Sequence, residues 1–103
     1  MRLKGYRLLR RNWRTRYGEI DLIARRGETL VFVEVKARWS KNKGLPEDSL
    51  TPEKKNRLLR LAEMYLSRHP HQGPVRLDVI AIDFCSEKPQ IRHYEGAIHA
   101  EET

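Results

Sequence analysis

The sequence predicts a single α/β domain in which a helix packs on a mixed β-sheet, and three features support this prediction. Two strand-like runs, 18–26 and 29–38, flank a short turn, and the second run is rich in β-branched residues. Apolar residues then recur at helical spacing after Thr51, and another strand-like run follows at residues 75–84. This order is typical of a mixed sheet covered by a helix. The 103 residues suffice for one domain with a modest core.

Three strands are expected before the helix. Residues 5–13 form the first strand, residues 18–26 the second, and residues 29–38 the third, which is dense in valine. Residues 39–50 contain a glycine, a proline and two lysines, so we expect a loop there.

The expected helix has clear signals at both ends. Thr51 is a good N-cap, Pro52 suits the first helical position, and Glu53 suits the first turn. Pro70 and Gly73 end the helix. Five apolar residues recur along one stripe that we expect to be buried: Leu58, Leu59, Ala62, Tyr65 and Leu66.

The rest of the chain adds one or two strands. Residues 75–84 are mostly apolar, which indicates a central strand. Asp78 lies within this strand, so we expect it to accept hydrogen bonds or to pair with an arginine. A last short strand is expected at residues 90–95, and residues 96–103 are expected to fray.

The hairpin between the second and third strands determines which residues face each other. Gly27 and Glu28 fit a two-residue type II′ turn, because glycine suits its first central position. Paired residues then have numbers that sum to 55. Three apolar pairs share one face in this register, which a one-residue slip would scramble: Ala24 with Val31, Leu22 with Val33, and Ile20 with Val35.

The opposite face of this hairpin gathers charged side chains. The same register places Asp21 opposite Glu34 and Glu19 opposite Lys36. Directly paired residues have Cβ atoms about 4.5–5.5 Å apart. The two carboxylates therefore repel each other unless one takes up a proton or a cation lies between them. A hard divalent ion such as Mg²⁺ binds one or two carboxylates together with water and phosphate.

Two carboxylates beside a lysine predict metal-assisted phosphodiester chemistry. Asp21 and Glu34 hold a metal that polarises a phosphoryl oxygen and lowers the pKa of a bound water. Lys36 orients that water or stabilises charge on the phosphate. Glu19 either pairs with Lys36, which we favour, or acts as an accessory ligand through water. The alternative for Asp21, Glu34 and Lys36 is a charge ladder on a solvated sheet face.

The charge distribution favours a nucleic-acid partner. The net charge is +7, and residues 1–60 hold 17 of the 21 Lys and Arg against 7 acids. Such a basic segment is typical of nucleic-acid binding, although it also fits a solvated surface. Trp13 and Tyr17 either stack on bases or pack at the sheet edge. The basic residues expected to contact nucleic acid are Arg10, Arg11, Arg14, Arg16, Arg38, Lys41, Lys43, Lys54, Lys55 and Arg57.

Composition also points to a location. The one cysteine, Cys85, excludes an internal disulfide. No apolar run approaches membrane-spanning length, and residues 1–11 lack the apolar stretch of a secretory signal. We therefore expect a cytoplasmic protein without membrane contact.

Three segments together resemble a known family. They are "GYRLLRRNWRTRYGEIDLIARRGETLVFVEVKAR", "GLPEDSLTPEKKNRLLRLAEMYL" and "RLDVIAI". Together they look like the YraN family of bacterial endonuclease-like proteins, in the PD-(D/E)xK nuclease superfamily. That family is similar in fold to archaeal Holliday junction resolvases. The resemblance implies a restriction-endonuclease-like αβββαβ core, a Mg²⁺ or Mn²⁺ site, a nucleic-acid substrate such as branched DNA, and a homodimer.

The resemblance carries over residue by residue onto the hairpin. It makes Asp21 and Glu34 the metal-binding acids, Lys36 the motif lysine, and the backbone carbonyl of Val35 a further metal ligand. Such proteins usually begin with a helix that adds another glutamate, and no residue here matches it. We expect either a late start or a lost helix, and in the second case Glu19 is the nearby acid that compensates.

The sequence thus predicts one restriction-endonuclease-like domain, residues 1–103, whose first helix is missing or truncated. We expect it to bind DNA and to hydrolyse phosphodiester bonds with Mg²⁺ or Mn²⁺. Two alternatives stay open: a non-catalytic nucleic-acid-binding module with a degenerate site, and a basic protein-interaction domain.

Overall fold

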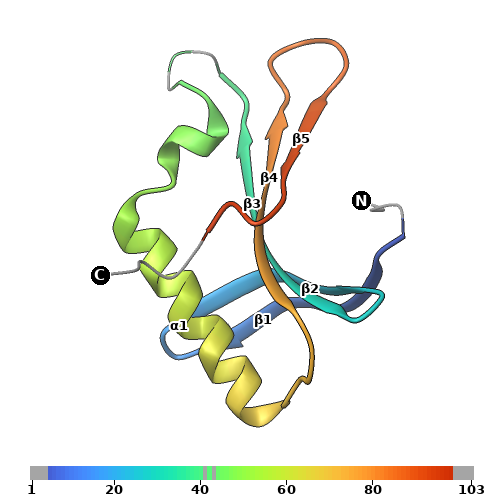
Figure 1. Ribbon diagram of the computed structural model, residues 1–103. Helices are drawn as coiled ribbons and strands as arrows, with labels where there is room; N and C mark the ends of the chain where they lie inside the picture. The colour runs from blue at the N-terminus through green and yellow to red at the C-terminus, as the bar shows by residue number, and fades with distance from the viewer. Residues whose placement is uncertain (1–4, 41, 43, 99–103) are drawn as a thin grey trace.

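The computed structural model describes residues 5–40, 42 and 44–98, and Figure 1 shows their arrangement. The predicted strands and helix are confirmed, although the first strand begins and ends two residues later than expected. A short 3-10 helix, η2, lies within the predicted loop. The elements in chain order are β1 (Arg7–Thr15), β2 (Gly18–Arg26), β3 (Thr29–Arg38), η2 (Pro46–Ser49), α1 (Pro52–Arg68), β4 (Val75–Asp83) and β5 (Gln90–Tyr94).

The five strands form one mixed sheet in the order β1-β2-β3-β4-β5. Strands β3 and β4 are parallel, and the other neighbours are antiparallel. Helix α1 makes the crossover between β3 and β4 and covers one face of the sheet (Figure 1). In Figure 1 the β1–β2 hairpin lies across the lower part of the molecule, whereas β4, β5 and the end of β3 lie above it. This architecture is compatible with the restriction-endonuclease-like α/β fold.

The ends of α1 lie where the sequence predicts them. The Thr51 side chain accepts a hydrogen bond from the N–H of Lys54 at 3.2 Å, as an N-cap does. At the other end the N–H of His69 donates to the carbonyl of Tyr65 at 2.8 Å. Pro70 follows and cannot continue the helix, since it has no N–H. In the part of the chain that the structure describes, no helix has both the length and the apolar character needed to cross a bilayer.

One core lies between α1 and the sheet. The helix buries Leu58, Leu61, Ala62 and Tyr65, so Leu61 joins the predicted stripe, while Leu59 and Leu66 are only partly buried. The sheet and the C-terminal segment supply the other buried members of this core: Ile20, Ile23, Leu30, Phe32, Leu77, Val79 and Ile98. Packing of this stripe, rather than helix propensity, is what stabilises a helix of this length.

Ile98 and Trp13 also pack against this core, and each bears on an expectation from the sequence. Ile98 is only 3% exposed, and its N–H donates to the carbonyl of Leu77 at 3.3 Å. The expected fraying is therefore wrong for residues 96–98, because this core covers Ile98; residues 99–103 lie outside the described part. The Trp13 ring meets Tyr65 edge-on at 5.3 Å, so Trp13 packs in the fold rather than presenting a free ring.

The expected β2–β3 hairpin turn is also confirmed. Gly27 has a φ of 59°, the left-handed conformation that the first central position of a type II′ turn requires. The pair Arg26–Thr29 closes the turn, and the numbers of the paired residues sum to 55 from there to Leu22–Val33.

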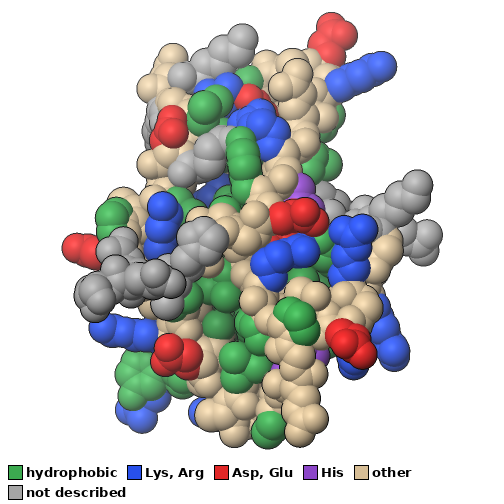
Figure 2. All heavy atoms as spheres, viewed as in Figure 1, with side chains coloured by type: hydrophobic (Ala, Val, Ile, Leu, Met, Phe, Trp, Pro, Cys, Tyr) green, Lys and Arg blue, Asp and Glu red, His purple; other side chains and the backbone are tan. Residues whose placement is uncertain are grey.

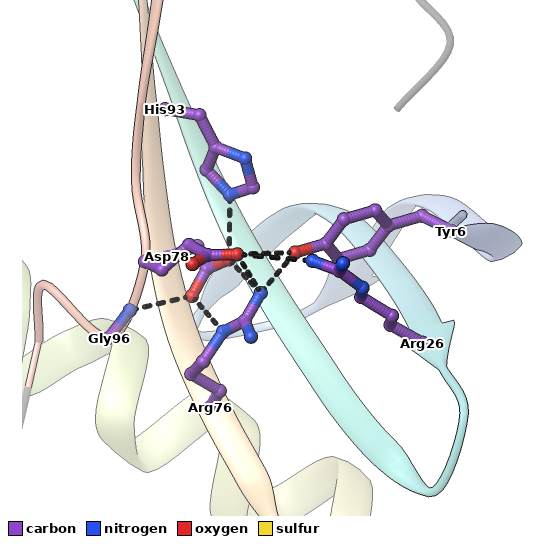
Figure 3. Close-up of polar contacts among 7 residues, drawn as sticks. Tyr6, Arg26, Arg76, Asp78, His93 and Gly96 are labelled. Carbon is purple, nitrogen blue, oxygen red and sulfur yellow. Dashed lines mark hydrogen bonds and ion pairs between the residues drawn. The ribbon is translucent and has the colours of Figure 1, made fainter. Parts of the chain in front are cut away.

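Asp78 is the centre of a polar network on the sheet face opposite α1 (Figure 3). It is fully buried, and its carboxylate accepts two hydrogen bonds from Arg76, both at 2.9 Å. His93 donates at 2.7 Å and the N–H of Gly96 at 2.8 Å. Arg76 also donates to the Tyr6 hydroxyl. This confirms the expectation for Asp78 and ties the segment before β1, strand β4 and the end of β5 together.

The donors around Asp78 decide its charge state. Burial by itself raises the pKa of a carboxyl group, but the hydrogen bonds from Arg76, Gly96 and His93 outweigh burial and lower the pKa of Asp78. A lowered pKa means that the ionised form stabilises the fold. This stabilisation is present above the unfolded-state pKa of about 3.9 and is lost as the pH falls through the folded-state pKa.

We expect Asp78→Ala to lower the free energy of unfolding at pH 7 by about 3 kcal/mol, because it leaves Arg76 without its buried partner. Urea unfolding at pH 7 measures this change. The exposed Glu87→Ala serves as the control and is expected to stay within about 0.5 kcal/mol of the wild type. The difference between wild type and Asp78→Ala should shrink below about pH 4; a difference that grows there would contradict the role of the ionised carboxylate.

Candidate functional site

The sheet divides where the β2–β3 ladder ends, at the pair Leu22–Val33. Beyond this pair β2 continues to pair with β1 as far as Gly18, whereas β3 continues to pair with β4 as far as Arg38. The predicted hairpin register is therefore wrong beyond Leu22–Val33. Three predicted pairs of described residues do not form: Ile20–Val35, Asp21–Glu34 and Glu19–Lys36.

Asp21 lies at the point of division. Its Oδ2 accepts a hydrogen bond from the N–H of Val35 at 2.7 Å. In an uninterrupted antiparallel ladder this N–H would donate to the backbone carbonyl of Ile20. A side-chain carboxylate thus replaces a backbone acceptor, and Ile20 packs instead in the core under α1, fully buried.

The neighbouring strand is distorted at the same level. Arg11 pairs with Leu22 and Trp13 pairs with Ile20. Asn12, which lies between these two residues of β1, has a φ of 48°. This left-handed conformation is uncommon for a non-glycine residue, although asparagine tolerates it better than most. Strained backbone of this kind is frequent at functional sites.

The division opens a small cavity between the sheet and α1, with a volume of about 160 Å³. Three acids predicted from the sequence meet there, and two basic and two apolar side chains of α1 complete the lining. The lining residues are Glu19, Asp21, Glu34, Lys54, Arg57, Leu58 and Leu61. We call this space the acidic cavity. The two motif carboxylates thus share one cavity, as predicted, even though they are not paired across the ladder.

The charged partners around the acidic cavity differ from the favoured expectation. Lys36 forms an ion pair with Glu34, with Nζ and Oε1 3.0 Å apart. Glu19 pairs instead with Arg14 of β1, with Nε and Oε2 3.1 Å apart. The expected Glu19–Lys36 pair is wrong because β2 and β3 have separated at that level. Lys36 and Glu34 are alternate residues of one strand and so lie on the same face.

The surroundings of Asp21 in this cavity raise its pKa above the usual range. Burial raises the pKa of Asp21, and the nearby charges of Glu34 and Glu19 raise it further. These effects outweigh the hydrogen bond from Val35 and the charge of Lys36, which lower it. The expected repulsion between the carboxylates is therefore present, and an ionised Asp21 costs stability at neutral pH.

The donor set of the acidic cavity fits a hard divalent ion. Among the described residues, no group of three or more His, Cys, Asp or Glu is arranged to hold a metal by itself. Asp21 and Glu34 supply two carboxylates, which is as many as Mg²⁺ commonly takes when water and phosphate complete its shell. The N–H of Val35 points toward Asp21. The carbonyl of a strand residue points to the same side as its N–H, so the Val35 carbonyl also faces the division.

The structure brings only some of the predicted basic residues to the acidic cavity. Lys54 and Arg57 line it, and the Nζ of Lys54 donates to the carbonyl of Ser49 at 3.0 Å. Lys55 lies elsewhere, beside Leu50 and Tyr94. Four exposed arginines lie along β1 and in the turn after it: Arg10, Arg11, Arg14 and Arg16. Figure 2 shows basic and acidic side chains interspersed on one face rather than one continuous basic patch.

The other predicted basic residues have different surroundings. Arg38 donates to Asp83 and to the carbonyl of Gly44, both at 2.6 Å, so its guanidinium is engaged within the fold. Sequence reasoning missed this pair, although the parallel register that aligns Leu30 with Val75 also aligns Arg38 with Asp83. Lys41 and Lys43 lie outside the described residues.

Sequence reasoning also missed a wider groove of about 760 Å³ beside the acidic cavity. Arg57 and Leu61 line both spaces, and Tyr17, Arg60 and Met64 extend the groove along α1. The helical spacing of Arg57, Arg60 and Met64 was the available signal, because residues three and four apart share one helix face.

The fold and the site define a mixed α/β protein whose sheet divides around two carboxylates, one on β2 and one on β3, with a lysine on β3 paired to the second. Comparison with family models identifies the particular family. Residues 1–82 match the model described as "Uncharacterised protein family UPF0102", and the chain belongs to this family. UPF0102 is the YraN family, which the sequence segments quoted above resemble.

Individual relatives agree with this assignment. A UPF0102 protein from Chlorobium phaeobacteroides is 52% identical over 80 residues, which cover 77% of this chain and 64% of that protein. One from Syntrophomonas wolfei is 43% identical over 94% of this chain and 85% of its own length. One from Leifsonia xyli is 47% identical over 91% of this chain and 81% of its own length. The chain thus spans less than two thirds of the Chlorobium protein.

We expect Asp21→Asn to stabilise the protein at pH 7 by about 0.5–2 kcal/mol, as relief of functional-site strain often does. Asparagine keeps an acceptor for the Val35 N–H and removes the charge. Because the pKa of Asp21 is raised, its penalty begins above about pH 3.9, the unfolded-state value, and is complete above the folded-state pKa.

Urea unfolding between pH 4 and pH 8 checks this expectation. The advantage of Asp21→Asn should be smallest near pH 4 and should grow toward pH 7. Glu63→Gln, on the exposed side of α1, is the matched control and is expected to stay within about 0.5 kcal/mol of the wild type at pH 7. An Asp21→Asn variant that is less stable than the wild type at pH 7 would contradict the electrostatic account of the site.

Proposed function

We propose that this protein is a metal-dependent endonuclease that hydrolyses phosphodiester bonds of nucleic acid, with DNA as the favoured substrate. One observation carries the proposal: Asp21 and Glu34 come from strands that part, and they line one cavity with the cations Lys54 and Arg57. An acidic centre attracts a divalent ion, and a basic border attracts a phosphate.

Each residue has a role in this proposal. Asp21 and Glu34 would hold Mg²⁺ or Mn²⁺, with the Val35 carbonyl as a neutral oxygen ligand. The bound ion supplies polarisation of a phosphoryl oxygen and a lowered pKa of its water. The ion pair with Glu34 holds Lys36 at the site, so its ammonium can neutralise negative charge that develops on the phosphate.

The electrostatics of the acidic cavity support the same roles. Burial and the charges of Glu34 and Glu19 raise the pKa of Asp21, and a divalent cation relieves that repulsion. Glu19 lines the same cavity and acts as an accessory acid through water. Lys54 and Arg57 approach from α1, where they serve to fix a phosphate beside the acids.

The proposal extends to the substrate, the assembly and the location. The exposed arginines of β1 and its turn provide sequence-independent phosphate contacts. By likeness to junction resolvases we propose branched DNA as a substrate and a homodimer as the working form. A cytoplasmic location fits a nucleic-acid enzyme with a single cysteine.

A second candidate function is nucleic-acid binding without catalysis. The observation that favours it is the small donor set, because no three His, Cys, Asp or Glu side chains of the described residues are arranged so that they could hold a metal ion together. In that case the same basic residues bind nucleic acid, and the carboxylates do not assemble a working centre.

We expect labelled DNA, both branched and single-stranded, to be cleaved in Mg²⁺ or Mn²⁺ and to stay intact in EDTA. Asp21→Ala and Glu34→Ala should each lower the cleavage rate by more than about 100-fold, since even the outer partners of metal ligands account for 10–100-fold. Glu63→Ala, an exposed acid on α1, is the control and should cleave at the wild-type rate.

Binding measured in EDTA separates the two candidate functions. Both alanine variants should still bind DNA, because the basic residues remain. Full cleavage by both variants would overturn the assignment of the acids. Salt-dependent DNA binding by the wild type, without cleavage in either metal, would favour the second candidate.

A further inference from the structure

Trp39 and Phe84 form a stacked pair of rings at the ends of β3 and β4. Their ring centroids are 4.0 Å apart, and the ring planes differ by 6°. The parallel register pairs Arg38 with Asp83, so the next residue of each strand falls beside the other. The N–H of Phe84 also donates to the carbonyl of Arg38 at 3.0 Å. The backbone therefore fixes the stack in advance of any partner.

The outer ring of this pair is accessible. Trp39 is 75% exposed, more than any other large hydrophobic side chain in the described part of the chain. It also borders a cavity of about 320 Å³ that has an apolar side formed by Ala37, Leu45 and Pro46. Ser40 and Ser49 add hydroxyl groups to the lining. A flat ring beside an apolar cavity with a few polar groups has the character of a small-ligand site.

The cavity beside Trp39 adjoins the acidic cavity through one lysine. Ser49 lines the cavity beside Trp39, and its carbonyl accepts the hydrogen bond from Lys54 at 3.0 Å. Lys54 in turn lines the acidic cavity. Trp39 follows Glu34 by five positions, just beyond the end of β3, which is a path of about 16 Å at the usual rise of a strand. A nucleic-acid strand held at the acids can therefore reach Trp39 within a few nucleotides.

We propose that the cavity beside Trp39 binds an unpaired base of a nucleic-acid substrate, with the base stacked on the Trp39 ring. This inference rests on the proposed function, and it names the substrate as nucleic acid with unpaired bases near the cleaved bond. Every base has a flat face that stacks on an aromatic ring, so such a site tolerates any sequence. The bases of an intact duplex are stacked inside the helix and cannot enter it without being flipped out.

Charge around the cavity is consistent with this occupant. Lys54 lies between the two cavities and supplies a cation for the phosphate that links a stacked base to the acids. Arg38 also lines the cavity, but Asp83 neutralises its charge. Affinity at this site therefore depends chiefly on the Trp39 ring.

Tryptophan fluorescence tests the proposal directly. The chain has two tryptophans, and Trp13→Phe leaves Trp39 as the single fluorophore. The probes are a twelve-nucleotide oligo(dT) and a blunt-ended duplex of two separate strands, which has no loop of unpaired bases, both in EDTA so that no cleavage occurs. We expect oligo(dT) to quench the Trp39 emission, and the duplex to do so only at a concentration at least tenfold higher. Equal quenching by the two probes, or none by oligo(dT) while it binds, would overturn the proposal.

Fluorescence anisotropy of labelled probes measures how tightly matched variants of the protein bind each probe. Trp39→Leu should weaken oligo(dT) binding at least tenfold and change duplex binding less than twofold, while Trp39→Phe should retain most of the affinity. Tyr94→Leu, which removes an exposed ring from β5, should bind oligo(dT) as the wild type does. If Trp39→Leu binds oligo(dT) as tightly as the wild type does, the proposal is contradicted.

Two further measurements separate this proposal from its alternatives. Sedimentation of Trp39→Leu should show the wild-type oligomeric state; a lost dimer that accounts for the weaker binding would assign Trp39 to a protein interface instead. Cleavage in Mg²⁺ is measured separately from the binding experiments in EDTA. Cleavage that does not depend on Trp39 or on unpaired bases would overturn only this inference, whereas stacking of oligo(dT) without cleavage would overturn only the nuclease assignment.

Discussion

The hydrogen bond from the N–H of Val35 to the carboxylate of Asp21 is the interaction on which the centre of this molecule depends. Two strands that separate leave backbone donors without their ladder partners, and a partly buried donor must be satisfied. The Asp21 carboxylate satisfies this one, so β2 and β3 can part. The same bond holds Asp21 in the cavity that Glu34 also lines. The division of the sheet and the presence of both acids in one cavity therefore have one cause.

Two buried or partly buried aspartates show opposite consequences of their surroundings. Asp78 has three donor groups around it, and they lower its pKa, so its charge stabilises the sheet. Burial and two neighbouring acids raise the pKa of Asp21, so its charge destabilises the fold. A carboxylate that is unfavourable in the isolated protein is common where a cation or a substrate completes the surroundings. Asp78 is in this sense a structural residue, and Asp21 is a candidate functional one.

The sequence predicts the regular parts of this fold because they depend on local signals. Thr51 and Pro52 set the start of α1, and Gly27 sets the hairpin register as far as Leu22–Val33. The division at Asp21 could not be predicted in the same way, because strand periodicity assumes an unbroken ladder. Ile20 was consequently assigned to the wrong face. The Trp39–Phe84 stack depends on the parallel pairing of β3 with β4, which joins segments far apart in sequence.

The position of a bound Mn²⁺ ion tests the central claim most directly, because Mn²⁺ prefers the same oxygen ligands as Mg²⁺ and is visible by anomalous diffraction. In crystals equilibrated with Mn²⁺, we expect one ion coordinated by carboxylate oxygens of both Asp21 and Glu34. Crystals of Asp21→Ala should lack it. A saturating concentration of Mn²⁺ that leaves these two carboxylates without a shared ion would contradict the account.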